Sequence, residues 1–366
     1  MVECQKLIGL IESIAPPLIQ EEWDNSGFQI GDRYSMIGKV MVALDLTEQV
    51  AIEAASAGAG MVLTHHPAFF RPVKSLTTDD DTGRAILTLN RYGIALYCAH
   101  TSWDNAPNGL NDALAEAVGL RDIRRLSSQG ALKKVVVFVP SGYEDDIATA
   151  MCDAGAGKIG RYSDCTFRAE GTGTFRPEEA AKPFIGSGGV LEKTKETRLE
   201  TIVDEYLLGA VVAAMLEAHP YEEAAYDIYN VERPGTISSG RLGELDTPME
   251  FDELCREMVA VFGRLRASGS EAALVEKVAV CGGAGASVME AASRMGADVL
   301  ITGDVRHHEA LMAAGAGLLL IDAGHYATER IGVDALTKRL QRLAFELQYS
   351  VEFIRSAAEK DPWRFY

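Results

Sequence analysis

The fold is decided by a stretch that reads EAAS at residues 53–56 and then MVLT at residues 61–64. The first four letters belong to a helical pattern and the next four form an apolar strand, so the stretch is one part of an α/β unit. Nearly the same letters return as EAAS at residues 290–293 and VLIT at residues 299–302. We interpret this match as two copies of one α/β unit.

Each copy extends in both directions as alternating strands and helices. Helices of this length between strands imply parallel pairing, with helices covering the sheet. In the first copy we predict strands at 39–44, 61–64 and 94–98 and helices at 48–57, 83–92 and 110–118. In the second copy we predict strands at 278–281, 298–302 and 318–321 and helices at 286–295, 306–314 and 329–347.

The region between the copies follows a different order, β-α-β-β-α-β, which is that of the ferredoxin-like split unit. Glycines and prolines crowd residues 171–189 and predict a long exposed loop. The predicted strands are 135–139, 164–168, 197–202 and 225–231, and the predicted helices are 145–153 and 206–218.

The predicted fold class is therefore α/β, with two quasi-repeated lobes and an inserted α+β ferredoxin-like domain. We place the first lobe at residues 1–131, the inserted domain at residues 132–233 and the second lobe at residues 234–366. A chain of 366 residues exceeds what one hydrophobic core usually holds, which agrees with more than one domain.

Composition limits the class of protein. The chain is 47% hydrophobic and 24% charged, which is typical of a globular protein. Its 53 acidic and 35 basic side chains leave a net charge of -18, which excludes nucleic acid as a main partner. No apolar run reaches the roughly 20 residues of a membrane span. The 6 cysteines form no CxxC pair, so we expect free thiols and a cytoplasmic protein.

Six of the seven histidines follow predicted strands. In parallel α/β sheets, ligands gather at the carboxyl ends of the strands, so these are suitable positions for a functional site. The six are His65, His66, His100, His307, His308 and His325.

Two of these histidines precede a carboxylate by four residues, and this spacing lets both groups reach one point from a helical turn. The pairs are His100 with Asp104 and His325 with Glu329. Imidazole and carboxylate donors together suit zinc, manganese or iron rather than calcium or magnesium. Adjacent residues of an extended chain point in opposite directions, so the His65–His66 pair predicts two ions, with Glu329 as the candidate bridge between them.

Other polar positions have two interpretations each. His307 and His308 face solvent or cap the helix that follows, and His219 is more consistent with a structural role than with a ligand. The glycines of residues 282–287 form either an anion cradle at a helix N-terminus or a tight turn. Arg71 and Lys74 either offset the charge of a phosphorylated substrate or are simply exposed.

Several motifs in combination resemble the Nif-three-like family, whose members are often labelled GTP cyclohydrolase I type 2 homologues. The motifs are WDNSGFQIG at 23–31, THHP at 64–67, HTSWD at 100–104, TGD at 302–304 and GHYATE at 324–329. The likeness extends from the first helix to near residue 355. GTGTFRP at 171–177 and HPYE at 219–222 are similar to the PII/CutA-like central domain of the longer members.

The resemblance implies a dinuclear metal site inside a toroidal homohexamer, completed where the two lobes meet. By this likeness His66 and Asp104 hold one ion, His65 and His325 hold the other, and Glu329 holds both. Zinc is the metal we expect first, with manganese or iron as alternatives. By this likeness His100 does not bind the metal directly, but either contacts a residue that does or transfers protons. Asp304 is likewise expected to contact a metal ligand rather than the metal.

The function implied is metal-dependent hydrolysis of a nucleotide or related small molecule, with His100 transferring protons. The family label implies ring opening of GTP at C8 of guanine with loss of formate. The alternative is a non-catalytic metal-binding regulator or scaffold whose PII-like insertion senses a ligand or binds a partner. A weaker third option is acyl transfer by Cys98, two residues from His100.

Overall fold

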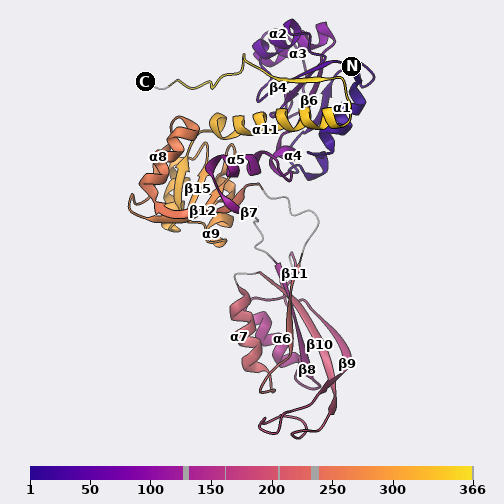
Figure 1. Cartoon of the computed structure of the whole chain (residues 1–366), viewed down its shortest axis with the longest axis vertical. Helices are drawn as coiled ribbons and strands as arrows, with labels where there is room; N and C mark the ends of the chain where they lie inside the picture. The colour runs from indigo at the N-terminus through magenta and orange to yellow at the C-terminus, as the bar shows by residue number, and fades with distance from the viewer. Residues whose placement is uncertain (127–131, 161, 205–206, 232–238, 365–366) are drawn as a thin grey trace. The chain divides into compact units, whose positions relative to one another are not determined.

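The computed structural model of the chain describes residues 1–126, 132–160, 162–204, 207–231 and 239–364 (Figure 1). Contacts divide the chain into unit 1, which is Met1–Ser128 with Ile237–Tyr366, and unit 2, which is Gln129–Thr236. Both ends of the chain therefore build unit 1. The predicted domain boundaries at residues 131 and 233–234 lie outside the described residues.

The first sheet of unit 1 has the strand order β17-β4-β5-β6-β2. The three central strands pair in parallel, as predicted, and so does β17 with β4, whereas β2 is antiparallel to β6. The strands are β2 (Gly27–Ile30), β4 (Lys39–Ala43), β5 (Met61–Thr64), β6 (Ala95–Cys98) and β17 (Glu352–Arg355).

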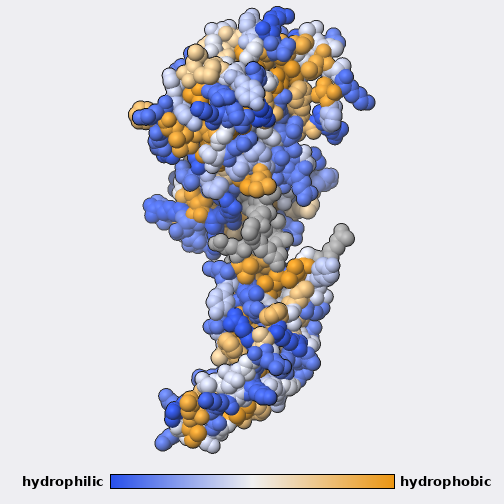
Figure 2. Space-filling view, turned by 90° about the vertical axis from the view of Figure 1, so that its right-hand side faces the viewer, coloured by the Kyte–Doolittle hydropathy of each residue, from blue (hydrophilic) through white to orange (hydrophobic). Residues whose placement is uncertain are grey.

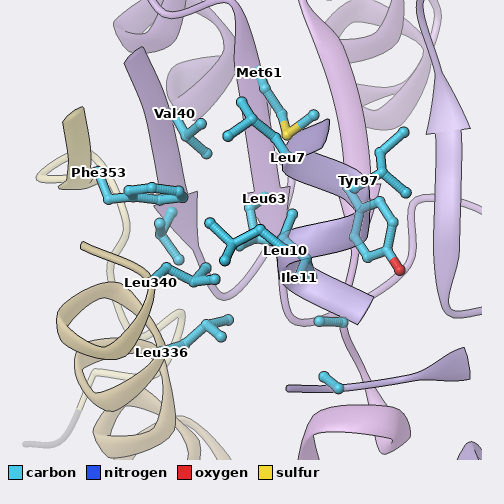
Figure 3. Close-up of a cluster of buried hydrophobic side chains, with 14 of the residues drawn as sticks. Leu7, Leu10, Ile11, Val40, Met61, Leu63, Tyr97, Leu336, Leu340 and Phe353 are labelled. Carbon is cyan, nitrogen blue, oxygen red and sulfur yellow. The ribbon is translucent and has the colours of Figure 1, made fainter. Parts of the chain in front are cut away.

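Both faces of this sheet are covered, because successive strand residues point to opposite sides. One face packs on α2 (Glu48–Ser56) and α3 (Asp81–Tyr92). The other packs on α1 (Cys4–Glu12) and α11 (His325–Glu346), where Leu7, Leu63 and Leu336 belong to one cluster (Figure 3). Burial on both sides explains why these strands read as continuous apolar runs.

The second sheet of unit 1 has the order β13-β16-β15-β14-β12-β7. Its β14, β15 and β16 pair in parallel, as predicted, and the outer strands pair antiparallel. Its strands are β7 (Arg121–Arg125), β12 (Arg241–Glu250), β13 (Arg266–Ser268), β14 (Leu274–Val280), β15 (Val299–Thr302) and β16 (Leu319–Asp322). One face packs on α5 (Leu110–Val118) and α8 (Phe251–Phe262), and the other on α9 (Met289–Arg294) and α10 (His307–Gly315).

Helix α11 connects the two halves of unit 1. Its Leu336 packs in the cluster of the first sheet, and its Ile331 packs against the cluster of the second. The helix begins at His325 rather than at the predicted residue 329. Gly324 before it adopts φ 85°, and the backbone turns there into the helix. His325 and Glu329 thus share one helical face.

Short elements complete unit 1. A two-stranded sheet pairs β1 with β3, and α4 lies directly after His100. These elements are β1 (Val2–Glu3), β3 (Met36–Ile37), α4 (Thr101–Asp104) and the 3₁₀ helices η1 (Pro17–Ile19) and η3 (Gly285–Val288).

Unit 2 contains an antiparallel sheet in the order β11-β8-β10-β9, packed on two helices around a core of its own. The glycines at 171 and 173 lie within β9, so the predicted loop is shorter than expected. The predicted helix start at residue 206 lies outside the described residues. The elements are β8 (Leu132–Pro140), α6 (Glu144–Asp153), β9 (Thr166–Phe175), β10 (Glu192–Asp204), α7 (Leu208–Ala218) and β11 (Tyr226–Val231).

Two expectations from composition agree with the structure. All 6 cysteines are free thiols. Over the described ranges, every helix is too short or too polar to cross a bilayer. On the face drawn in Figure 2, hydrophobic residues lie interspersed with hydrophilic ones.

Candidate metal centre

Two adjacent histidines follow the end of β5, in a bend whose backbone is held by the last residue of β4 and the residue after it. The amide of His65 donates to Ala43 and that of His66 donates to Leu44. Contrary to the expectation for extended chain, their rings do not point in opposite directions but lie 5.0 Å apart between centroids, and both face the carboxylate of Glu329. His65 Nε2 lies 3.7 Å from Glu329 Oε1, and His66 Nε2 lies 3.1 Å from Glu329 Oε2. The buried carboxylate thus lies within reach of both rings.

The first turn of α11 supplies that carboxylate together with a third imidazole. His325 Nε2 lies 3.0 Å from Glu329 Oε2 and 3.4 Å from His66 Nε2. The turn after β14 gives Glu329 room: Gly283 adopts φ +65°, and a Cβ there would lie 2.2 Å from Glu329 Oε1. Only glycine tolerates both the conformation and the close approach.

The short helix α4 contributes the remaining predicted residues. Asp104 Oδ1 lies 3.6 Å from His65 Nε2. The ring of His100 lies 5.1 Å from that of His65 and 5.3 Å from that of His66, between centroids. The structure therefore brings together the five predicted metal ligands and the predicted proton-transfer residue: His65, His66, His100, Asp104, His325 and Glu329. Two groups of them could each hold a metal ion, His65 with His66 and His100, and His66 with His325 and Glu329.

Each of the four imidazoles is oriented by an acceptor at its Nδ1 atom. Because a carbonyl or carboxylate oxygen can only accept, Nδ1 carries a proton in each ring, and Nε2 faces the centre, where it presents a lone pair whenever the ring is neutral. The acceptors are Ala99 O for His65 at 3.1 Å, Asp45 for His66 at 2.8 Å, Asp24 for His100 at 2.7 Å and Asp304 for His325 at 2.8 Å.

The inward-facing atoms are left without hydrogen-bond partners. Buried His65 Nε2, Asp104 Oδ1 and Glu329 Oε2 have none within the part of the chain that the structure describes. Lone pairs of nitrogen and oxygen that face one another in a buried space repel, and leaving them unsatisfied is costly. A cation between them removes the repulsion, so these residues fit a metal ion.

The pKa values report the same demand for positive charge. Burial lowers the pKa of His65 to about 4, so this ring is neutral. Burial alone would also lower the pKa of His66 and of His325, but their hydrogen bonds to carboxylates raise it to about 10 and about 9. Burial and the neighbouring Glu329 raise the pKa of Asp104. Although burial opposes ionisation of Glu329, the surrounding histidines lower its pKa.

Sequence reasoning missed two of the orienting carboxylates, Asp24 and Asp45. Asp45 follows β4 closely, so the argument applied to histidines at strand ends would have found it. Asp24 lies in a loop far from any predicted strand end, and only the folded chain brings it to His100. Although burial would raise the pKa of Asp24, hydrogen bonds with His100 and Thr101 lower it.

The remaining sequence alternatives are also decided by hydrogen bonds and exposure. The amides of Gly282, Gly283 and Gly285 donate to the side chains of Asn111, Thr328 and Thr302, so the glycine segment is a tight turn and not an anion cradle. His307 and His308 are exposed at the start of α10. His219 is buried in unit 2, where both of its nitrogens have hydrogen-bond partners in the backbone.

Two cavities border the centre. One, of about 670 Å³, is lined by Asp24, Asn25 and residues 69–76. The other, of about 1070 Å³, has His325 and Asp304 in its wall. Both volumes match the size of small-molecule sites in proteins, which is commonly about 300–1,000 Å³.

The fold and the site together define a mixed α/β protein with a buried histidine–glutamate group that could bind a metal ion. A sequence profile of the Duf34/NIF3 (NGG1p interacting factor 3) family matches residues 2–362, and the chain belongs to this family.

Relatives over the full length agree with this assignment. The chain is 42% identical to a GTP cyclohydrolase 1 type 2 homolog of Halalkalibacterium halodurans, over 99% of this chain and 98% of the relative. It is 41% identical to the protein of the same name from Bacillus subtilis, over 100% of this chain and 99% of the relative. The crystal structure of a Bacillus cereus protein related to NIF3 covers 99% of both chains at 38% identity, with a TM-score of 0.68.

Proposed function

We propose that the chain is a dinuclear-metal-dependent hydrolase that acts on a nucleotide or a related small molecule. The observation that carries this proposal is the set of four imidazoles whose Nδ1 atoms are held by acceptors, together with the buried Glu329 carboxylate at the Nε2 atoms of His65, His66 and His325. Outer carboxylates of this kind fix the tautomer of a metal-binding histidine and make it more basic.

Five side chains would hold the ions: His65, His66, Asp104, His325 and Glu329. The sequence prediction joined His66 to Asp104 and His65 to His325. The distances favour another division, because His65 Nε2 is near Asp104 Oδ1 and Glu329 Oε1, whereas His66 and His325 lie at Glu329 Oε2. In both divisions Glu329 would help to hold both ions. Zinc suits these nitrogen and oxygen donors, and manganese or iron would also fit.

Ions bound there would supply Lewis-acid chemistry, polarising a substrate oxygen and making water acidic enough to react near neutral pH. The protein's own proton carrier is His100. Its Nδ1 atom donates to Asp24 at 2.7 Å, and this hydrogen bond fixes the orientation of the ring. Its Nε2 atom is then available to accept a proton from water and to return it to a leaving group.

The substrate class follows from the relatives and from the cavities. Full-length relatives are named GTP cyclohydrolase 1 type 2 homolog, so ring opening of GTP at guanine C8 with release of formate is the first reaction to test. A small-molecule cavity beside the centre favours catalysis over a closed structural metal site.

The test is a turnover assay on full-length protein stripped with a chelator and reloaded with zinc, manganese or iron. GTP, with formate as the detected product, and a panel of phosphoesters are the substrates. We expect turnover in at least one metal form, lost in His100→Ala and retained in His308→Ala, an exposed histidine outside the centre. Stoichiometric metal binding without turnover on any substrate would contradict the enzyme and favour the second candidate.

That second candidate is a metal-binding regulator or scaffold, and unit 2 is the feature that favours it. Its element order β8-α6-β9-β10-α7-β11 and its separate core support a ferredoxin-like domain inserted between two quasi-repeated lobes. Such a domain would sense a ligand or bind a partner. We also propose that the chain forms the toroidal homohexamer that the resemblance implies. Light scattering of the purified chain would test this.

A further inference from the structure

Two aromatic side chains stand against the ring of His100. Trp23 and Phe70 each contact it edge-on, with 5.7 Å between ring centroids. Both are largely exposed, Trp23 to 63% and Phe70 to 52%, although large aromatic residues usually bury most of their surface. The aromatic surface beside the proposed proton carrier is therefore free to contact a planar molecule.

Phe70 also lines the cavity of about 670 Å³, together with Asp24 and the rest of residues 69–76. Hydrogen bonds from the segment after Trp23 hold the start of this wall. The side-chain Nδ2 of Asn25 donates to the carbonyl of Phe69 at 2.6 Å, and Gln29 Oε1 accepts from the backbone amide of Ala68 at 3.0 Å. The wall is thus tied to the same segment that carries Asp24 and Trp23.

The cavity wall carries two cations, and the acid in that wall, Asp24, is already paired with His100. Arg71 and Lys74 line it, and neither forms an ion pair with another residue in the described ranges. In the second cavity two of the three arginines are paired, Arg264 with Asp361 and Arg266 with Asp322. In a chain of net charge -18, two unbalanced cations next to a candidate metal centre point to an anionic ligand.

We propose that this cavity binds the substrate as a phosphorylated molecule with a planar ring. Arg71 and Lys74 contact the phosphate groups, because a guanidinium and an ammonium make charge-assisted hydrogen bonds to phosphate oxygens. Trp23 and Phe70 contact the ring, which brings it next to His100. The inference rests on the proposed function only in that the centre acts on a small molecule.

The experiment measures equilibrium binding to the zinc-loaded full-length chain, so it does not depend on turnover. The probes are GTP, ATP, inorganic pyrophosphate and, as the uncharged counterpart, guanosine. Calorimetry gives the dissociation constants, and the change of tryptophan fluorescence gives an independent signal in a Trp363→Phe background, which retains exposed Trp23 and buried Trp103. Metal content is measured for every variant. It should equal that of the parent, because the substituted side chains lie outside the proposed set of metal ligands.

We expect GTP, ATP and pyrophosphate to bind, and guanosine to bind at least about tenfold more weakly than GTP, since charge-assisted contacts are the stronger ones. The double substitution Arg71→Ala with Lys74→Ala should weaken the binding of GTP by about tenfold or more, while the metal content stays unchanged. Lys6→Ala with Arg91→Ala, which removes two exposed cations elsewhere, should leave binding as it was. Trp23→Phe should abolish the fluorescence change.

Three results would overturn the inference. They are equal GTP affinity in the Arg71/Lys74 double variant and the parent, equal affinity for guanosine and GTP, and no saturable binding of any phosphorylated probe to the parent. Binding of the probes without metal-dependent turnover would instead count against the proposed enzyme and leave the cavity assignment in place.

Discussion

The chain buries histidine in two regions under opposite conditions. In unit 2, Nε2 of His219 donates to the carbonyl of Phe138 and its Nδ1 accepts from the amide of Tyr221, so the buried ring is fully satisfied. In unit 1, His65 is also buried, but among the described residues only its Nδ1 has a hydrogen-bond partner, and its Nε2 faces carboxylates. The difference teaches that burial alone does not identify a functional histidine. The unsatisfied nitrogen does.

The largest effect is expected at Glu329, which lies close to all three imidazoles that would hold the ions. Glu329→Gln removes the negative charge with little change of shape, so metal affinity should fall by more than the roughly 10–100-fold that loss of an outer partner costs. Calorimetric titration of the stripped protein measures this. Glu346→Gln, exposed at the end of the same helix, is the matched control and should bind metal normally.

A smaller loss is expected when an orienting carboxylate is changed. Asp45→Asn keeps the size of the side chain but weakens its hold on His66 Nδ1, and metal affinity should fall about 10–100-fold. Asp304→Asn should act alike through His325. Unchanged affinity in both variants would mean that these contacts orient rings without supporting a metal.

The pH dependence of metal binding follows from the raised pKa values. Without metal, His66 keeps its proton below about pH 10 and His325 below about pH 9. A metal ion must displace these protons, so its affinity should rise with pH between 6 and 9, by about tenfold per unit for each proton released. Calorimetry in two buffers of different ionisation enthalpy counts the protons. Binding that releases none would contradict this account of the metal-free centre.

His219 should give the smallest effect on metal and a local effect on stability. His219→Ala leaves the buried carbonyl of Phe138 without its donor, which should destabilise unit 2 by about 1–3 kcal/mol. Hydrogen exchange of peptides from β8 and β11 measures the loss. Metal content should equal that of the parent, and a clear decrease would remove the distinction between the two buried histidines.

Much of the fold and of the candidate site could be predicted because both depend on local patterns. Strands such as β5 are apolar on both faces, and the site residues follow strand ends or lie four apart in one turn. Other features depend on contacts that no local pattern carries. Strand β7, which reads RDIRR, has no apolar alternation because it lies at a sheet edge, and β9 contains glycines that are typical of loops. Asp24 lies 76 positions before His100 in the sequence and becomes its partner only in the folded chain.

The most direct test is anomalous X-ray scattering at the zinc, iron and manganese edges, on crystals of protein purified without chelators. The account predicts two peaks that share Glu329, one bounded also by His65 and Asp104 and the other by His66 and His325. Absence of any peak at these side chains, or peaks only elsewhere in the molecule, would contradict it.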